Sequence, residues 1–282
     1  MKQMTINRVR TEPFAGIKSG SELLVLAQGW LKQGNPIVAI ELLKTAIESI
    51  DTERDKQLRA QILKETGRAK MMQSDWTHSE TYYLEAQRLF IELEDYKGAA
   101  QCARNRANMN FQQGNYHESE KLCETALDYA TVENDHELRA TILNTMGAIK
   151  SATGNLQESI KMLKLCLSDF ESSGNIIRQG YIQLNIGLTQ IELADYHDAT
   201  QSLNHALSIA LEVRDQSLLE ICYQNISKCY LAQQEYILAK SVLDTARKIL
   251  PGLNSKALEV ELNLIECKIL RVTGNLEKAA DL

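Results

Sequence analysis

The sequence predicts an all-α solenoid of about seven helical hairpins, and three observations support this fold class. One spacing of forty residues runs through the chain without a slip, small side chains recur at fixed places within it, and residues that begin or end helices recur between them. A fixed period of 20 to 50 residues is typical of repeat architectures.

The spacing is easiest to count from Gly154. Steps of forty residues reach one anchor residue in each copy: Gly34, Ser74, Gly114, Gly154, Ala194, Gln234 and Gly274. In every copy the next residue is Asn, Asp or Glu, and a Pro, Trp, Tyr or Leu follows it. Each copy therefore predicts a first helix before its anchor, a tight turn, and a second helix after it.

Small side chains mark three positions where helices approach closely. Seven residues before the anchors stand Ala27, Gly67, Ala107, Gly147, Gly187, Ser227 and Cys267. Five residues after them stand Ala39, Ser79, Ser119, Ser159, Ala199, Ala239 and Ala279, and Ala or Cys recurs twelve after. This pattern predicts packed helical hairpins.

The helix ends also repeat. Residues that favour the N-cap position stand 21 after the anchors: Asp55, Asp95, Asp135, Asn175, Asp215 and Ser255. Their side chains can satisfy the first N–H groups of the next helix. Pro36 suits the first turn of the helix that it begins. Pro251 ends the long helix that comes directly before Pro251 in the chain.

These offsets, with a Gly-Asn/Asp-Tyr turn between the helices, resemble the tetratricopeptide repeat over roughly residues 20–282. The usual period of that repeat is 34 residues. A period of forty is similar to kinesin light chains, LGN/Pins adaptors and the sensor domains of bacterial regulators. The resemblance implies a right-handed α-solenoid. Four residues depart from it: Ala194 and Gln234 replace the turn Gly, and Arg106 and Glu266 replace an apolar residue.

The predicted domain organisation is an N-terminal arm, 1–19, and a superhelix, 20–282. The last copy stops a few residues into its second helix, although a terminal repeat should carry a polar cap. We therefore expect the natural chain to continue, with more repeats or an effector domain.

Charge and composition narrow the partners and the cellular compartment that we expect for this protein. The formal net charge is −6, which disfavours nucleic acid and anionic membrane surfaces as partners. The N-terminus lacks the apolar run of a secretory signal, and no stretch is apolar enough to span a bilayer, so we expect a cytoplasmic protein. The six cysteines lack a metal-ligand spacing and are expected to be buried, reduced thiols.

No catalytic motif stands out, so the sequence predicts neither an enzyme nor a cofactor or metal site. His117 and His197 share one register and are expected on the solvated surface. Acidic pairs near second-helix starts suit the helix dipole better than acid–base catalysis.

The resemblance implies a concave binding wall lined by the first helices. Residues 12, 8 and 5 before the anchors are mostly apolar, as in Ile142, Met146 and Ile149, and should face the core. The opposite stripe supplies the candidate peptide-binding residues: Lys64, Arg68, Arg104, Asn105, Asn108, Asn144, Tyr181, Leu184, Asn185, Leu188, Gln224, Asn225 and Lys228.

Two features of this stripe suggest its ligand. Asn recurs nine before the anchor, as Asn105, Asn185 and Asn225, and an amide can both donate to and accept from a peptide backbone. Basic residues gather at one end and apolar ones at the other. An extended, partly acidic peptide fits this pattern, although Thr141 and Thr145 stand where basic residues would complete a carboxylate clamp.

Three interpretations remain open. The leading one is a protein- or peptide-binding module that is a scaffold or sensor part of a larger regulatory protein. The second is a structural scaffold that self-associates through its ends, including the uncapped C-terminal repeat. The third is the regulatory part of an enzyme whose active site lies elsewhere.

Overall fold

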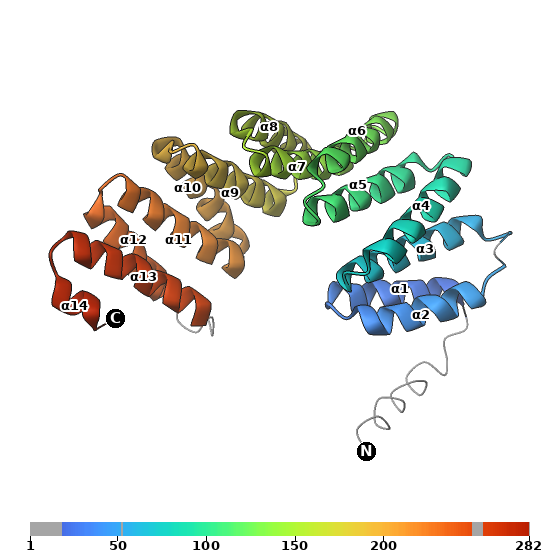
Figure 1. The fold of residues 1–282 in the computed structure, drawn as a ribbon, viewed down its shortest axis with the longest axis horizontal. Helices are drawn as coiled ribbons and strands as arrows, with labels where there is room; N and C mark the ends of the chain where they lie inside the picture. The colour runs from blue at the N-terminus through green and yellow to red at the C-terminus, as the bar shows by residue number, and fades with distance from the viewer. Residues whose placement is uncertain (1–18, 52, 250–255, 282) are drawn as a thin grey trace, which may run out of the picture. The chain divides into compact units, whose positions relative to one another are not determined.

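Helices make up the regular structure of residues 19–51, 53–249 and 256–281, the parts that this computed structural model describes, and no strand occurs among them (Figure 1). The chain divides into two compact units, which meet in sequence between Asn134 and Asp135. Unit 1 holds α1 (Gly20–Lys32), α2 (Pro36–Glu48), α3 (Lys56–Met72), α4 (Trp76–Glu92), α5 (Tyr96–Gln112) and α6 (Tyr116–Val132). Unit 2 holds α7 (His136–Ala152), α8 (Leu156–Ser172), α9 (Ile176–Glu192), α10 (Tyr196–Val213), α11 (Gln216–Ala232), α12 (Tyr236–Ile249), α13 (Lys256–Val272) and α14 (Leu276–Ala280).

The helices confirm the predicted hairpins, because each anchor residue lies in the turn between the two helices of one pair. The geometry also explains the long period. In the third copy α5 and α6 each have 17 residues, and three-residue turns follow each of them. Two such helices and two such turns fill one period of forty residues.

All seven anchors adopt the left-handed backbone conformation, with φ between 58° at Ser74 and 81° at Gly274. The turn after α5 shows why: Asn115 N–H donates to the Asn110 carbonyl and Gly114 N–H to the Phe111 carbonyl. This is a Schellman helix end, which needs a left-handed residue and therefore favours Gly. Ala194 and Gln234 make the same turn without Gly, at φ 59° and 63°.

Most predicted N-caps are confirmed at the first helices. The side chains of Asp95, Asp135, Asn175 and Asp215 each accept a hydrogen bond from the backbone N–H three residues on. Asp55 occupies the N-cap of α3 without such a bond. Ser255 and Pro251 lie outside the described residues, as does most of the predicted arm, residues 1–18.

Close approach within each hairpin occurs at the small residues. A Cβ added at Gly187 would lie 2.8 Å from Cγ of Leu203, so only glycine fits there without movement. Ser119 and Ser159 reinforce the contact, because their buried hydroxyls donate to the carbonyls of Ala107 and Gly147 across the hairpin, at 2.7 and 2.8 Å.

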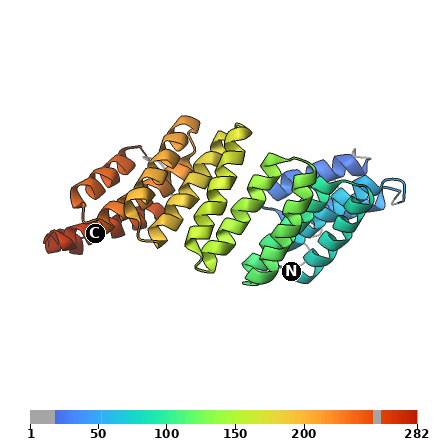
Figure 2. The ribbon, with the colours of Figure 1, turned by 90° about the horizontal axis from the view of Figure 1, so that it is seen from above.

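Within each unit the helices form two layers (Figures 1 and 2). First helices contact one another, as α3 does with α1 and α5 in unit 1 and α11 does with α9 and α13 in unit 2, while the second helices pack on them. Ile142, Met146 and Ile149 are buried between the layers, as predicted, together with Ile182 and Ile186.

Arg106 and Glu266, the two charged residues that depart from the apolar pattern, each form polar contacts with the neighbouring repeat. Arg106 donates to Glu80 and Gln87 of the preceding second helix, with its Nε 2.8 Å from Glu80 Oε1. Glu266 pairs with Lys240 and Arg247, which occupy the equivalent positions in the sixth copy. The two networks therefore share one geometry with the charges reversed.

Candidate functional site

The candidate residues lie on the first helices of the two units, and each unit is described by itself. In unit 1 they are Lys64 and Arg68 on α3 with Arg104, Asn105 and Asn108 on α5; in unit 2 they lie on α7, α9 and α11. Most of them are half-buried. The stripe is less exposed than the sequence suggests because adjacent first helices pack against one another.

In unit 1 the basic side chains contact neighbouring helices. Lys64 Nζ donates to Gln101 Oε1 on α5 at 2.6 Å. Arg68 Nη1 lies 3.6 Å from Oε2 of the buried Glu65, and Gln28 of α1 donates to the other oxygen of that carboxylate. Helices α1, α3 and α5 are thus joined by polar contacts along the candidate stripe.

Asn105 accepts a hydrogen bond from Arg104 Nη2 at 2.9 Å on the same helix. Since an amide offers two donor hydrogens and an acceptor oxygen, Asn105 keeps its donor capacity for another group.

In unit 2 two candidate asparagines contact each other directly. Asn185 Nδ2 on α9 donates to Asn144 Oδ1 on α7 at 3.0 Å. One amide hydrogen of Asn185 is used in this bond, and its side-chain oxygen accepts no bond within the described residues. The pair fixes the orientation of both amides and retains hydrogen-bonding capacity for a ligand.

The side chain of Tyr181, on α9, is held against the start of α11. Its hydroxyl donates to Asp215 Oδ2 at 3.0 Å, while Oδ1 of the same carboxylate caps α11 by accepting from Leu218 N–H. Burial raises the pKa of Tyr181, and the hydrogen bond to Asp215 raises it further.

The structure corrects the position of Leu184. Its side chain is only 4% exposed and belongs to the core between the layers of unit 2. The cause is the contact of α9 with α11, which covers the position ten before the anchor. Leu188, on the same helix, is half-buried beside this core, so of the two leucines Leu188 is the one that offers apolar surface.

The remaining candidates lie on α11. Asn225 donates to the backbone carbonyl of Ile221 at 2.8 Å, which directs its amide along its own helix. Gln224 is half-buried and Lys228 is exposed.

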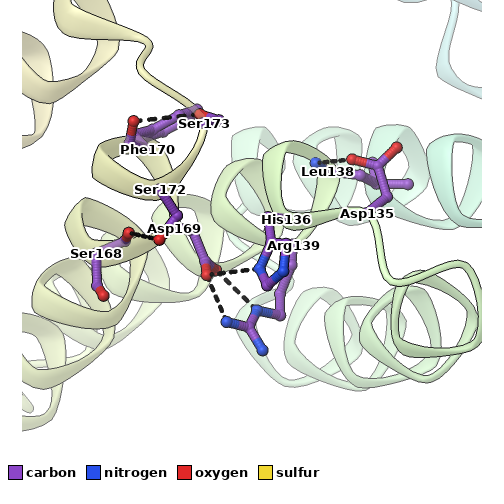
Figure 3. A network of polar contacts seen from close by, with 9 residues as sticks. All are labelled: Asp135, His136, Leu138, Arg139, Ser168, Asp169, Phe170, Ser172 and Ser173. Atoms are coloured by element: carbon purple, nitrogen blue, oxygen red, sulfur yellow. Dashed lines mark hydrogen bonds and ion pairs between the residues drawn. The ribbon is translucent and has the colours of Figure 1, made fainter.

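Sequence reasoning missed one buried polar cluster, shown in Figure 3. Asp169 on α8 is 3% exposed and accepts from Arg139 Nε at 2.7 Å and from His136 Nδ1 at 3.3 Å, both on α7. Burial raises the pKa of Asp169, but the hydrogen bonds from Arg139 and His136 outweigh it, so the pKa lies below the ordinary value of an aspartate. The available signal was a break in the pattern, because most other copies carry Leu, Tyr or Ile fifteen after the anchor.

Other expectations concern the cysteines and histidines. Five cysteines are buried thiols, and burial raises the pKa of Cys102 to about 12, whereas Cys267 is only half-buried. His117 and His197 are exposed, as predicted.

No three His, Cys, Asp or Glu side chains in the described ranges are arranged to hold a metal ion. In the same ranges, no helix combines the length and the apolar character needed to cross a membrane.

Comparison with known proteins identifies the repeat. A family model described as "Tetratricopeptide repeat" matches residues 98–172. No curated protein matches the sequence.

Solved structures show the same fold. BtubC from P. vanneervenii is 18% identical with a TM-score of 0.66, over 85% of this chain and 94% of its own. The apo form of RapI is 14% identical with a TM-score of 0.73, over 96% of this chain and 76% of its own. A Rap protein complexed with competence and sporulation factor is 16% identical with a TM-score of 0.65, over 92% and 76%. The chain therefore has the tetratricopeptide-repeat fold, built from an α-helical repeat of forty residues.

Proposed function

We propose that this tetratricopeptide-repeat protein is an interaction module that binds an extended segment of a partner protein through its first helices. The repeat fold supports the general role of a protein-binding scaffold. One neighbour of the same fold was solved with competence and sporulation factor bound, and another carries a tetratricopeptide repeat sensor in a signal transduction ATPase. We accordingly propose a scaffold or sensor part of a larger cytoplasmic regulatory protein, with no catalytic step of its own.

The Asn144–Asn185 pair is the observation that carries this proposal. A surface that serves only solubility needs no fixed amides, whereas these two are oriented by a hydrogen bond between helices. An oriented amide with remaining donor and acceptor positions suits a peptide backbone, which offers the same groups in every residue. Tyr181 and Leu188 on the same helix add apolar surface beside it.

The test is a library of dodecapeptides screened against the purified chain. We expect the double variant Asn185→Ala/Asn225→Ala to bind the selected peptides about thirtyfold more weakly, since two hydrogen bonds of about 1 kcal/mol each are at stake. The matched control is Gln157→Ala/Asn204→Ala, which removes two exposed amides from the second helices of the same unit. Equal binding by both variants would contradict the proposal.

Self-association is the second candidate, and exposed apolar side chains in the seventh copy favour it. Val260 and Leu264 on α13 are 57% and 50% exposed, and Leu276 on α14 is 64% exposed. A concentration-dependent increase in mass by light scattering, abolished by Val260→Ser/Leu264→Ser, would support this candidate. A constant monomer mass would exclude it.

A further inference from the structure

Two junctions between neighbouring repeats are joined by charged side chains at positions that elsewhere hold mainly apolar ones. A junction is the contact of one repeat's second helix with the next repeat's first helix, as between α4 and α5 or between α12 and α13 (Figure 1). In the second-to-third junction, Arg106 of α5 donates to Glu80 and Gln87 of α4, at 2.8 and 3.0 Å. The fourth-to-fifth junction has apolar side chains at the same positions: Ile160, Leu167 and Ile186. Two hairpins of this repeat therefore stack without charge.

The sixth-to-seventh junction has the opposite arrangement of charge. Glu266 of α13 accepts from Lys240 of α12 at 2.5 Å and pairs with Arg247 of the same helix. Arg247 also donates to Asn263 of α13 at 2.9 Å. Burial raises the pKa of Glu266, but the hydrogen bonds from Lys240 and Arg247 lower it below the ordinary value of a glutamate. The first helix is thus positive at one junction and negative at the other.

Both charges lie where the repeat buries its side chains. Glu266 is 9% exposed and the side chain of Arg106 is 14% exposed, while the equivalent Ile186 and Ile226 are 3% and 2% exposed. A buried ion pair is often no more stabilising than well-packed apolar residues, whereas a buried charge that has lost its partner is strongly unfavourable. Such a network therefore discriminates between neighbours more than it strengthens the contact.

Exchanged neighbours would bring like charges together. If α5 stacked on α12, Arg106 would meet Lys240 and Arg247. If α13 stacked on α4, Glu266 would meet Glu80. Stacking either helix on the apolar face of α8 would bury its charge without a partner. Wrong assembly and the exchange of elements between copies are characteristic failures of repeat proteins, so these penalties act where the fold is most prone to error.

We propose that the two networks select the neighbours of α5 and α13, and so prevent the exchange of hairpins between two copies of this chain. The partner that each charged first helix accepts is a second helix of opposite charge. Discrimination comes from the difference in sign between the two junctions, because one junction rejects what the other accepts. Peptide binding by the first helices plays no part in this selection.

The test gives both junctions the same sign. The transplant variant, Glu80→Lys/Gln87→Arg/Arg106→Glu, copies the sixth-to-seventh network into the second-to-third junction. Parent and variant, each as the full chain, are unfolded in urea, refolded at high protein concentration and sized by chromatography with light scattering. We expect the urea midpoint to stay close to that of the parent and the fraction of swapped oligomer to rise about tenfold, since discrimination is a difference between two stacking free energies. Swapped oligomer persists on dilution, which separates it from reversible self-association.

A variant with six substitutions is the matched control. It adds Lys240→Glu/Arg247→Gln/Glu266→Arg to the transplant, so that the two networks are exchanged and their signs differ again. We expect this variant to refold to the size of the parent, although it carries twice as many substitutions as the transplant. A role in stability alone would give the reverse order, with the six substitutions more damaging than the three.

A transplant variant that refolds as cleanly as the parent would overturn the proposal, and so would a control that forms as much swapped oligomer as the transplant. If the transplant variant does not fold, Glu80→Ile/Gln87→Leu/Arg106→Ile decides, because it copies the apolar fourth-to-fifth junction. Swapped oligomer from this apolar variant supports the proposal. Clean refolding overturns it, and so does a failure to fold, since the network would then be needed for stability and not for selection.

Discussion

Removing Arg139 should destabilise the chain more than removing Asp169, although the two side chains form one pair. Asp169 is buried, whereas the side chain of Arg139 is 45% exposed. After Arg139→Ala, a buried carboxylate keeps only its bond to His136. After Asp169→Ala, the guanidinium is left in contact with water.

The magnitudes follow from what each variant leaves behind. Breaking a fully buried pair costs about 3–5 kcal/mol, and an exposed pair contributes about 0–1 kcal/mol. Since one partner here is buried and His136 remains, we expect Arg139→Ala to lower the free energy of unfolding by about 2–3 kcal/mol. Asp169→Ala should lower it by about 1 kcal/mol, and the double variant should resemble Asp169→Ala.

Urea unfolding followed by circular dichroism measures these differences, and hydrogen exchange in α7 and α8 locates them. The control is Lys161→Ala on α8, where the lysine lies 4.0 Å from Glu158 and both side chains are exposed. It should change stability by less than about 0.5 kcal/mol. If Asp169→Ala is the more damaging single variant, the reasoning from burial is refuted.

Three further predictions concern pH and backbone. The pKa of the Asp169 carboxyl is lowered on folding, so the stability that its ionised form contributes is present above about pH 3.9 and is lost as the pH falls through the folded-state pKa. In an acid titration, the Arg139→Ala variant should therefore lose less unfolding free energy than the parent. Ala194→Gly should raise the free energy of unfolding by about 1 kcal/mol, and with it the urea midpoint, because Ala is strained at positive φ. An unchanged midpoint would argue against strain at this position. Gly187→Ala should cost about 1–2 kcal/mol through its clash with Leu203, whereas Gly29→Ala, with open space around it, should stabilise α1 in the same assay.

The sequence predicted the repeat and its helix ends well. The anchors, the N-caps of the first helices and the core residues such as Ile142 depend on interactions within one hairpin or across one turn. These interactions act over short distances in the chain, so their residues recur at a fixed spacing and can be counted directly.

Contacts between neighbouring repeats were predicted less well. Leu184 was assigned to the binding surface, but the packing of α9 against α11 buries it. The Asn144–Asn185 bond and the anchorage of Tyr181 on Asp215 join residues 41 and 34 positions apart. Such pairs depend on how far each hairpin rotates against the next, and the pattern within one copy does not encode that rotation.

The amino-acid sequence by itself therefore determined the fold class, the hairpin boundaries and the face of each first helix that points away from the core. Tertiary structure alone decided which residues of that face remain accessible and which of its polar groups are held in one orientation, as at Asn185. The physical reason is that helix formation and capping are local, whereas burial and hydrogen-bond satisfaction depend on the neighbouring repeat.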